Sequence, residues 1–230
     1  MTNTGDKDLQ AEYEAFLEDK AFPCVAAKAA LARNQVRCYV AGHMACPHHD
    51  AGILQFLYEF VDAYRAAGTS FHSAAVLFKG PETTSEEAFD VLLWQRLQAL
   101  ADLDRQTYAH DERVDADPAS PAFAFSLKAE AFFVIGLHPA SSRPSRQFGW
   151  PAIVFNPHAE FEKLRRTASY EKMRHIVRKK DLAYSGSVNP MLTDFGKASD
   201  VYQYSGRQYG PDWQCPLHLD YAPTKHHPAP

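Results

Sequence analysis

The segment 131–148, AFFVIGLHPASSRPSRQF, constrains the fold of this chain more than any other stretch. Its apolar run, Phe132–Leu137, is typical of a buried strand. His138 follows directly, and Pro139, which lacks a backbone N–H, ends the ladder of strand hydrogen bonds there. The segment therefore predicts a buried strand that carries one imidazole to its end.

Polar side chains gather directly after this strand. They are two serines and two arginines: Ser141, Ser142, Arg143 and Arg146. An imidazole held against apolar residues, with cations just beyond it, suits a buried metal ion or a porphyrin with anionic edges. The alternative is a hydrogen-bonded turn histidine followed by arginines that face water. Considered alone, the segment favours that alternative, because such turns are more common than ligand sites.

Hydrophobic periodicity along the rest of the chain predicts a mixture of helices and strands. We expect helices over 6–20, 25–33, 52–67, 85–107 and 158–182, and strands over 36–41, 74–78, 122–126, 131–137 and 151–155. Thr84 with Glu87 predicts a capping box, and Asn156-Pro157 is typical of a helix start. From Ser185 onward Gly, Ser, Pro, Asn and Tyr dominate, which predicts a long coil.

These elements predict an α+β fold with a mixed or antiparallel sheet flanked by helices. We expect a single domain over 1–222, ending in the long C-terminal coil, and a flexible tail over 223–230. The sequence contains no GxGxxG and no GxxxxGK[ST] loop, so dinucleotide and P-loop chemistry have no support. It also lacks HExxH and GxSxG, which leaves a hydrolase little to rest on.

Charge and hydropathy exclude several classes of partner. The formal net charge is −4, so we expect no binding to nucleic acid or to an anionic membrane surface. No apolar run approaches the length of a membrane span. The polar, acidic start of the chain resembles neither a signal nor a transit peptide, so a cytoplasmic location is expected.

The cysteines do not form a recognisable framework. Cys24, Cys38, Cys46 and Cys215 show no CxxC pair and no disulfide spacing, so free thiols are expected. The segment 38–49, CYVAGHMACPHH, is dense in Cys and His and could bind zinc. Its spacing matches no standard zinc pattern, however, and a solvated loop with incidental histidines is the better interpretation.

Several motifs, taken in order, resemble those of the YqcI/YcgG family. They lie at 22–31 (FPCVAAKAAL), 133–148 (FVIGLHP followed by SR, R and F), 154–165 (VFNP followed by FEKLR), 187–192 (SVNPML), 204–207 (YSGR) and 213–216 (WQCP). Each motif is weak alone, but together they cover nearly the whole chain. The sequence departs from these motifs in two places. Gln147 stands where an Arg is usual, which weakens any assignment of the cations that meet a cofactor. The Cys- and His-rich segment 38–49 is unusual for the family and leaves the binding of a second metal open.

The branch most similar to this chain is the haem-dependent N-hydroxylases of the guanitoxin-biosynthesis type. The resemblance implies a haem b cofactor with His138 as the axial iron ligand and with Ser142, Arg143 and Arg146 near the propionates. Oxygen activation usually gains from a thiolate ligand, so Cys24 and Cys215, both in motif positions, remain rival ligands.

The resemblance also implies a guanidine-bearing, arginine-like substrate that is hydroxylated on nitrogen, with O2 and an external electron donor as further partners. We expect Asn189, Tyr204 and Arg207 to contact this substrate, with Arg207 pairing with its carboxylate. A haem carrier or sensor without turnover is the alternative, a haem-free structural protein is a weaker one, and a homodimer is left open.

Overall fold

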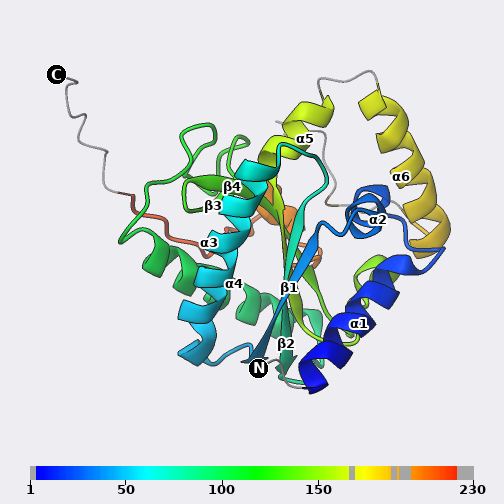
Figure 1. The fold of residues 1–230 in the computed structure, drawn as a ribbon, viewed down its shortest axis with the longest axis horizontal. Coiled ribbons are helices and arrows are strands. Elements are labelled where there is room, and N and C mark those ends of the chain that lie inside the picture. The colour runs from blue at the N-terminus through cyan, green and yellow to red at the C-terminus, as the bar shows by residue number, and fades with distance from the viewer. Residues whose placement is uncertain (1–3, 166–168, 188–190, 192–197, 222–230) are drawn as a thin grey trace.

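A five-stranded sheet forms the centre of the molecule (Figure 1). The computed structural model describes residues 4–165, 169–187, 191 and 198–221. In spatial order the strands are β1 (Val36–His43), β2 (Ser73–Gly80), β5 (Ala152–Pro157), β4 (Glu130–Leu137) and β3 (Phe125–Leu127). The strand predicted at 131–137 is thus β4, an interior strand.

The sheet is mixed, as the sequence predicts. Strands β1 and β2 run parallel and are connected by helix α3 (Asp50–Ala67), whereas the pairs β2–β5, β5–β4 and β4–β3 are antiparallel. The first six residues of β2 and nearly all of β5 are buried, because helices cover the sheet. Such strands consist of near-continuous apolar runs instead of alternating ones.

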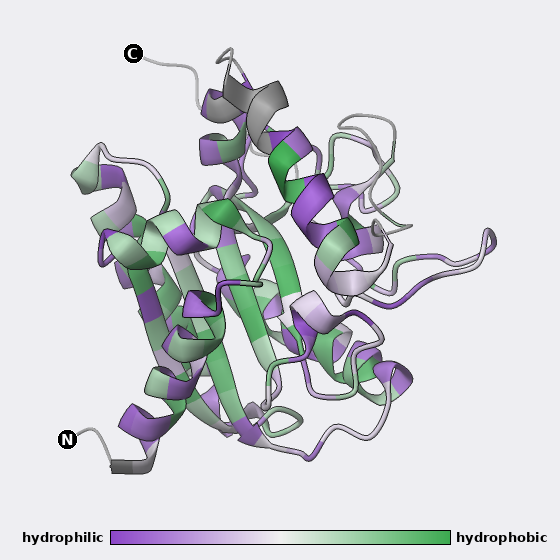
Figure 2. Cartoon of the chain, turned by 90° about the vertical axis from the view of Figure 1, so that its right-hand side faces the viewer, coloured by the Kyte–Doolittle hydropathy of each residue, from purple (hydrophilic) through white to green (hydrophobic). Residues whose placement is uncertain are grey.

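Helices pack on both faces of the sheet, and Figure 1 shows α3 and α4 on one side with α1 and α2 on the other. The remaining helices are α1 (Thr4–Glu18), α2 (Val25–Ala32), α4 (Glu86–Asp104), α5 (His158–Arg165) and α6 (Ser169–Ser185). Figure 2 shows that apolar residues concentrate on the strands and on the helix surfaces that face them. The described residues form an α+β fold in one domain.

Two apolar clusters result from this layering. The larger one lies between the sheet and α3 and α4, and it includes Phe60, Phe89 and Phe132. The smaller one lies under α1 and α2, with Leu9 and Tyr13 among its members. Each large side chain buried in this way contributes about 1.5–3 kcal/mol, so the clusters fix the positions of the strand ends.

The structure corrects three details of the predicted elements. The helix expected over 158–182 is two helices, α5 and α6. Asn156 is not a helix cap but belongs to β5, where its side chain accepts a hydrogen bond from the Ser73 hydroxyl at 3.0 Å. The N-cap of α4 is Ser85 instead of Thr84, because the Ser85 hydroxyl accepts from the Ala88 backbone N–H at 3.1 Å.

The C-terminal segment, residues 198–221, contains the short 3-10 helix η3 (Asp200–Gln203) and is otherwise without regular structure. It packs against the larger apolar cluster through Val201, Tyr204 and Leu217. Its contact with β4 is direct, because the carbonyl of Tyr204 accepts a hydrogen bond from the Gly136 backbone N–H at 2.6 Å. No helix within the described residues is long and apolar enough to cross a membrane.

Candidate functional site

Strand β4 delivers His138 to the position that the sequence predicts. The β4–β5 ladder ends at the pair Leu137 and Ala152, one residue before His138. The backbone N–H of His138 then donates to the carbonyl of Arg146 at 3.0 Å, and its carbonyl accepts from Ser141 at 3.3 Å. The chain therefore turns tightly around the histidine as soon as the strand ends.

The imidazole of His138 is fully buried and has no hydrogen-bond partner. Its relative exposure is 0 %, and neither ring nitrogen is hydrogen-bonded. The ring of Phe89, on α4, stacks on it with centroids 4.2 Å apart. Buried polar groups are nearly always paired, so an imidazole with two free nitrogens needs an explanation.

The ionisation of His138 follows from this environment. Burial lowers its pKa to about 4; the charge of Arg146 lowers it too, while the carboxylate of Glu86 acts in the opposite direction. The ring is therefore neutral at pH 7. A neutral imidazole with a free nitrogen is the form that coordinates a metal.

The polar residues after the strand hydrogen-bond to other protein groups, whether they are buried like Arg143 or exposed like Ser142. Arg143 donates to the Asp181 carboxylate at 2.6 Å and to the carbonyl of Ser187 at 3.0 Å. Both the hydroxyl and the backbone N–H of Ser142 donate to Glu86, at 2.7 and 2.8 Å. The turn after His138 is thus attached to α6 and to the first turn of α4.

Arg146 has the most internal contacts of these residues. Its side chain is buried, and it donates to the backbone carbonyls of Gly136 at 3.2 Å, Tyr204 at 3.1 Å and Gln203 at 2.6 Å. Burial lowers the pKa of this guanidinium to about 10, which leaves it charged at pH 7. Arg146 therefore ties the end of β4 to the C-terminal segment.

The three residues predicted to contact substrate have different surroundings. The Tyr204 hydroxyl is buried, accepts from Phe125 N–H at 3.1 Å and approaches the carbonyl of Phe132 at 3.4 Å. Arg207 is partly exposed and lies near the carboxylates of Glu87 and Asp90 on α4. Asn189 lies outside the described residues.

The two candidate thiolates lie apart from one another. Cys24 is the N-cap of α2 and packs with the smaller cluster, whereas Cys215 packs against the larger one. Burial raises the pKa of both thiols, that of Cys215 to about 12, so both carry their proton at pH 7. His138, stacked on Phe89, is on the same side of the sheet as Cys215.

The Cys- and His-rich segment is spread over two elements. Cys38 lies within β1 and His43 ends that strand, while Cys46 is exposed just before the 3-10 helix η1 (Pro47–His49). Throughout the part of the chain that the structure describes, no three His, Cys, Asp or Glu side chains are placed to hold a metal ion together.

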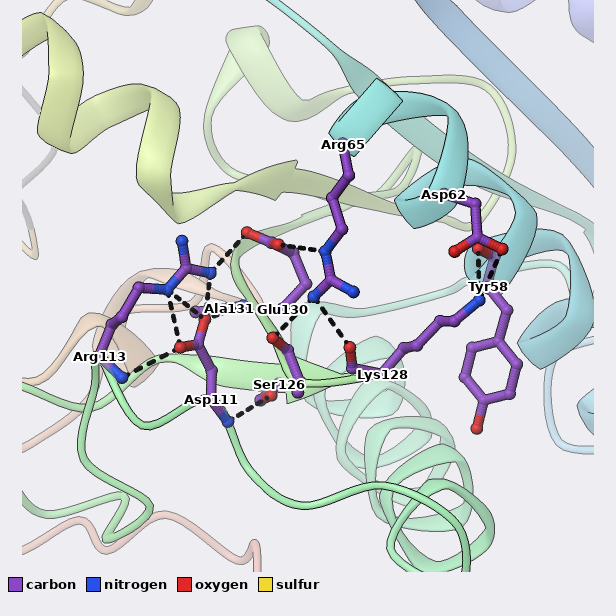
Figure 3. Close-up of polar contacts among 10 residues, drawn as sticks. Tyr58, Asp62, Arg65, Asp111, Arg113, Ser126, Lys128, Glu130 and Ala131 are labelled. Carbon is purple, nitrogen blue, oxygen red and sulfur yellow. Dashed lines mark hydrogen bonds and ion pairs between the residues drawn. The ribbon is translucent and has the colours of Figure 1, made fainter. Parts of the chain in front are cut away.

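A second group of charged residues joins α3, the loop before β3 and the β3–β4 hairpin (Figure 3). Glu130 accepts from Arg65 at 3.1 Å and from Arg113 at 2.8 Å, and Arg113 also pairs with Asp111. Both carboxylates are buried, and each lies against a cation. Each buried carboxylate is thus paired with an arginine that is partly exposed, and we interpret this group as a structural connection between the three elements.

Sequence reasoning did not identify α4 as part of the site. Glu86, Phe89 and Asp90 fall within the first two turns of a helix whose pattern indicates only an amphipathic element. Their proximity to His138 and Arg207 depends on how the helix crosses the sheet. Only the spacing of three between Glu87 and Asp90, which puts two carboxylates on one helix face, could have indicated it.

The fold and the site together define a class: an α+β protein that buries an unpartnered imidazole at the end of an interior strand. The model of the YqcI/YcgG family matches residues 13–218, so this chain belongs to that family. The match includes α4, His138 and the C-terminal segment up to residue 218.

Two relatives come from Bacillus subtilis (strain 168), and both are described as uncharacterized proteins. The chain is 27% identical to YcgG over 182 residues, covering 76% of this chain and 71% of YcgG. It is 26% identical to YqcI over 191 residues, covering 80% of this chain and 74% of YqcI. No solved structure matches the chain significantly.

Proposed function

We propose that this protein is a haem-dependent monooxygenase that hydroxylates a guanidine-bearing, arginine-like small molecule on nitrogen, with His138 as the axial ligand of iron. The observation that supports it is the buried, neutral imidazole with two unpartnered nitrogens. The reaction class, N-hydroxylation, is inferred from the motifs around His138, which resemble those of the N-hydroxylase branch.

The residues around His138 fit a haem ligand in one respect and call for rearrangement in another. An imidazole without hydrogen-bond partners has the chemistry of an iron ligand, although it is fully buried under Phe89 and the side chains around it would have to move to admit a haem. Arg143 and Arg146, by contrast, already hydrogen-bond to protein groups, and they would have to exchange these bonds to meet propionates. In the present arrangement they position the turn that presents His138.

The protein's own residues set the character of this ligand. Phe89 covers one face of the ring and fixes its plane. Neither ring nitrogen contacts a carboxylate, so the imidazole stays neutral and donates fewer electrons than a thiolate or a carboxylate-paired histidine would. Bound haem would supply the activation of O2.

The proposed reaction inserts one atom of O2 into a guanidine N–H bond. The second oxygen atom is reduced to water by two electrons and two protons. The sequence has no dinucleotide-binding loop, so these electrons come from an external donor.

The visible spectrum of the purified protein tests the cofactor first. We expect a Soret band and about one haem per chain, which His138→Ala abolishes or shifts strongly because it removes the axial bond. Cys24→Ala and Cys215→Ala are matched controls. A wild-type spectrum in His138→Ala together with a changed spectrum in a cysteine variant would instead identify a thiolate ligand, and a colourless protein that does not take up hemin would refute the proposal.

Turnover separates the enzyme from the alternative, a haem carrier or sensor. The assay combines haem-loaded protein, an electron donor, O2 and arginine-like compounds, with mass spectrometry of the product. A product that contains a new N–O bond supports the N-hydroxylase. Haem binding without any such product supports the carrier or sensor.

A further inference from the structure

The guanidinium group of Arg207 lies between two carboxylates of α4. Its Nη2 is 3.5 Å from Oε1 of Glu87, and its Nη1 is 3.6 Å from Oδ2 of Asp90. Both distances exceed those of a normal N–H···O hydrogen bond. The Arg207 side chain is also 34 % exposed, so it is held loosely between the two carboxylates.

The carboxylate of Asp90 is buried and oriented in a way that favours a cation beside it. Its Oδ1 accepts hydrogen bonds from the indole N–H of Trp94 at 2.8 Å and from the Tyr209 hydroxyl. These two neutral donors fix the orientation of the carboxylate without neutralising its charge. A buried carboxylate is stable only when paired, and the cation facing Oδ2 of Asp90 is the distant Arg207.

Glu87 and the ring of Tyr209 complete the surroundings of the guanidinium. Hydrogen bonds from its own backbone N–H and from Ser85 lower the pKa of Glu87, so this carboxylate is charged at pH 7. The Tyr209 ring centroid is 6.0 Å from Cζ of Arg207. Two carboxylates beside an aromatic face are the groups that bind a planar guanidinium.

These groups lie next to the buried imidazole. Phe89, which stacks on His138, directly precedes Asp90 in α4. On the other side, Gly206 directly precedes Arg207 and packs so closely on the Arg146 side chain that an added Cβ would lie 2.7 Å from it. The first turns of α4 therefore contact both the guanidinium group of Arg207 and the ring of His138.

We propose that Glu87 and Asp90 bind the guanidinium group of the substrate, and that Arg207 occupies this position when substrate is absent. The identity of the ligand as a guanidine rests on the proposed function. The incoming guanidinium displaces a side chain of the same chemistry that makes no short hydrogen bond to either carboxylate. Arg207 thus acts as an internal competitor of the substrate, and it does not recognise the substrate carboxylate.

Agmatine separates this arrangement from the one in which Arg207 binds a carboxylate, because agmatine has a guanidinium group but no carboxylate. Agmatine and arginine are titrated into the purified protein by calorimetry, with tryptophan fluorescence as a second readout because Trp94 contacts Asp90. We expect Arg207→Ala to bind agmatine about two- to fivefold more tightly, since a loose, partly exposed ion pair no longer competes.

The carboxylate variants should act in the opposite direction. Asp90→Asn and Glu87→Gln are expected to weaken agmatine binding about tenfold, because each removes a charge-assisted contact. Glu87 is 62 % exposed, so Glu87→Gln reports on binding even if Asp90→Asn disturbs folding. Asp102→Asn is the matched control on the same helix: it pairs with Arg105 at the far end of α4 and should bind as the wild type does.

The possible results are distinct from those that test the haem. Weaker agmatine binding by Arg207→Ala, unchanged binding by both carboxylate variants, or no binding by any of these proteins would overturn the inference. A Soret band combined with any of those results leaves the proposed cofactor standing and removes only the role of Glu87 and Asp90. Agmatine binding with the expected signs in a protein that stays colourless and takes up no added hemin supports the carboxylate site, while the proposed cofactor fails its own test.

Discussion

His138 is a residue whose burial has a measurable consequence for stability. Burial lowers its pKa to about 4, whereas an unfolded histidine titrates near 6.5. Between these values the unfolded chain binds a proton at this position and the folded chain does not. The free energy of unfolding therefore falls as the pH decreases from about 6.5 to about 4, and this contribution is fully present above pH 6.5.

We expect His138→Ala to lack this part of the pH dependence in the haem-free protein. The cavity left by alanine lowers stability by an amount that does not vary with pH, so the signal is the change in the difference between the two proteins. Chemical denaturation between pH 4 and pH 7.5 measures it. A constant difference across that range would show that the folded-state pKa of His138 is not lowered.

At the residue scale, the location of a side chain can be predicted from the sequence when the residues that determine it lie in one short segment. The apolar run before His138 and the proline after it were enough to place the imidazole at the end of a buried strand. The partners of Arg146 could not be predicted, because Gln203 and Tyr204 are 57 and 58 residues away along the chain. The opposing carboxylates of Arg207 were missed for the same reason.

At the scale of elements, β4, α4 and the C-terminal segment meet at Gly136. A Cβ built on this glycine would lie 2.5 and 2.9 Å from atoms of the Phe89 ring and 3.0 Å from the carbonyl oxygen of Tyr204. The absence of a side chain at this position thus allows the helix and the coil to approach the strand. The same ring stacks on His138, so the contact also sets the position of the imidazole.

We therefore expect Gly136→Ala to lower the free energy of unfolding by about 1–3 kcal/mol, as overpacking of a core does. Gly149→Ala is the control, because nothing lies within 4 Å of a Cβ built there. Thermal or chemical denaturation compares the two variants with the wild type. Equal stability of all three would mean that Phe89 can move away at little cost.

Local patterns predicted the elements better than they predicted their boundaries. Apolar patterns in the sequence indicated α1, α3 and each strand of the sheet, because the buried surface of an element requires apolar residues at regular positions or in a continuous run. The single helix expected over 158–182 is α5 and α6 instead, although no proline or glycine marks the break. Asn156 misled for a physical reason: its amide hydrogen-bonds across the sheet to Ser73, which is distant in sequence.

At the scale of the whole molecule, Arg146 connects the strand that carries His138 to the C-terminal segment. We expect Arg146→Met to lower the free energy of unfolding by about 2–4 kcal/mol, because the buried carbonyl of Gln203 loses its side-chain donor and that of Tyr204 keeps only the Gly136 N–H. The C-terminal segment 198–221 should also become more accessible to limited proteolysis, with cleavage sites identified by mass spectrometry. Arg37→Met, at an exposed position of β1, is the matched control.

If Arg146→Met and Arg37→Met are equally stable and equally resistant to protease, the other contacts of the C-terminal segment hold it in place without Arg146. Those contacts are substantial, since Val201, Tyr204 and Leu217 belong to the larger cluster. The sequence predicted this region only as a long coil. Coils are specified by contacts with other parts of the molecule, which leave no periodic pattern.

The attachment of the C-terminal segment to β4 has a consequence for biosynthesis. The ribosome completes β4 long before it adds Gln203 and Tyr204, whose carbonyls accept from Arg146 and Gly136. While those residues are still in the exit tunnel, the end of β4 lacks these partners. The surroundings of His138 are therefore finished only after Gln203 and Tyr204 have left the tunnel, and whatever ligand the imidazole takes meets a complete site only when the C-terminal segment has joined β4.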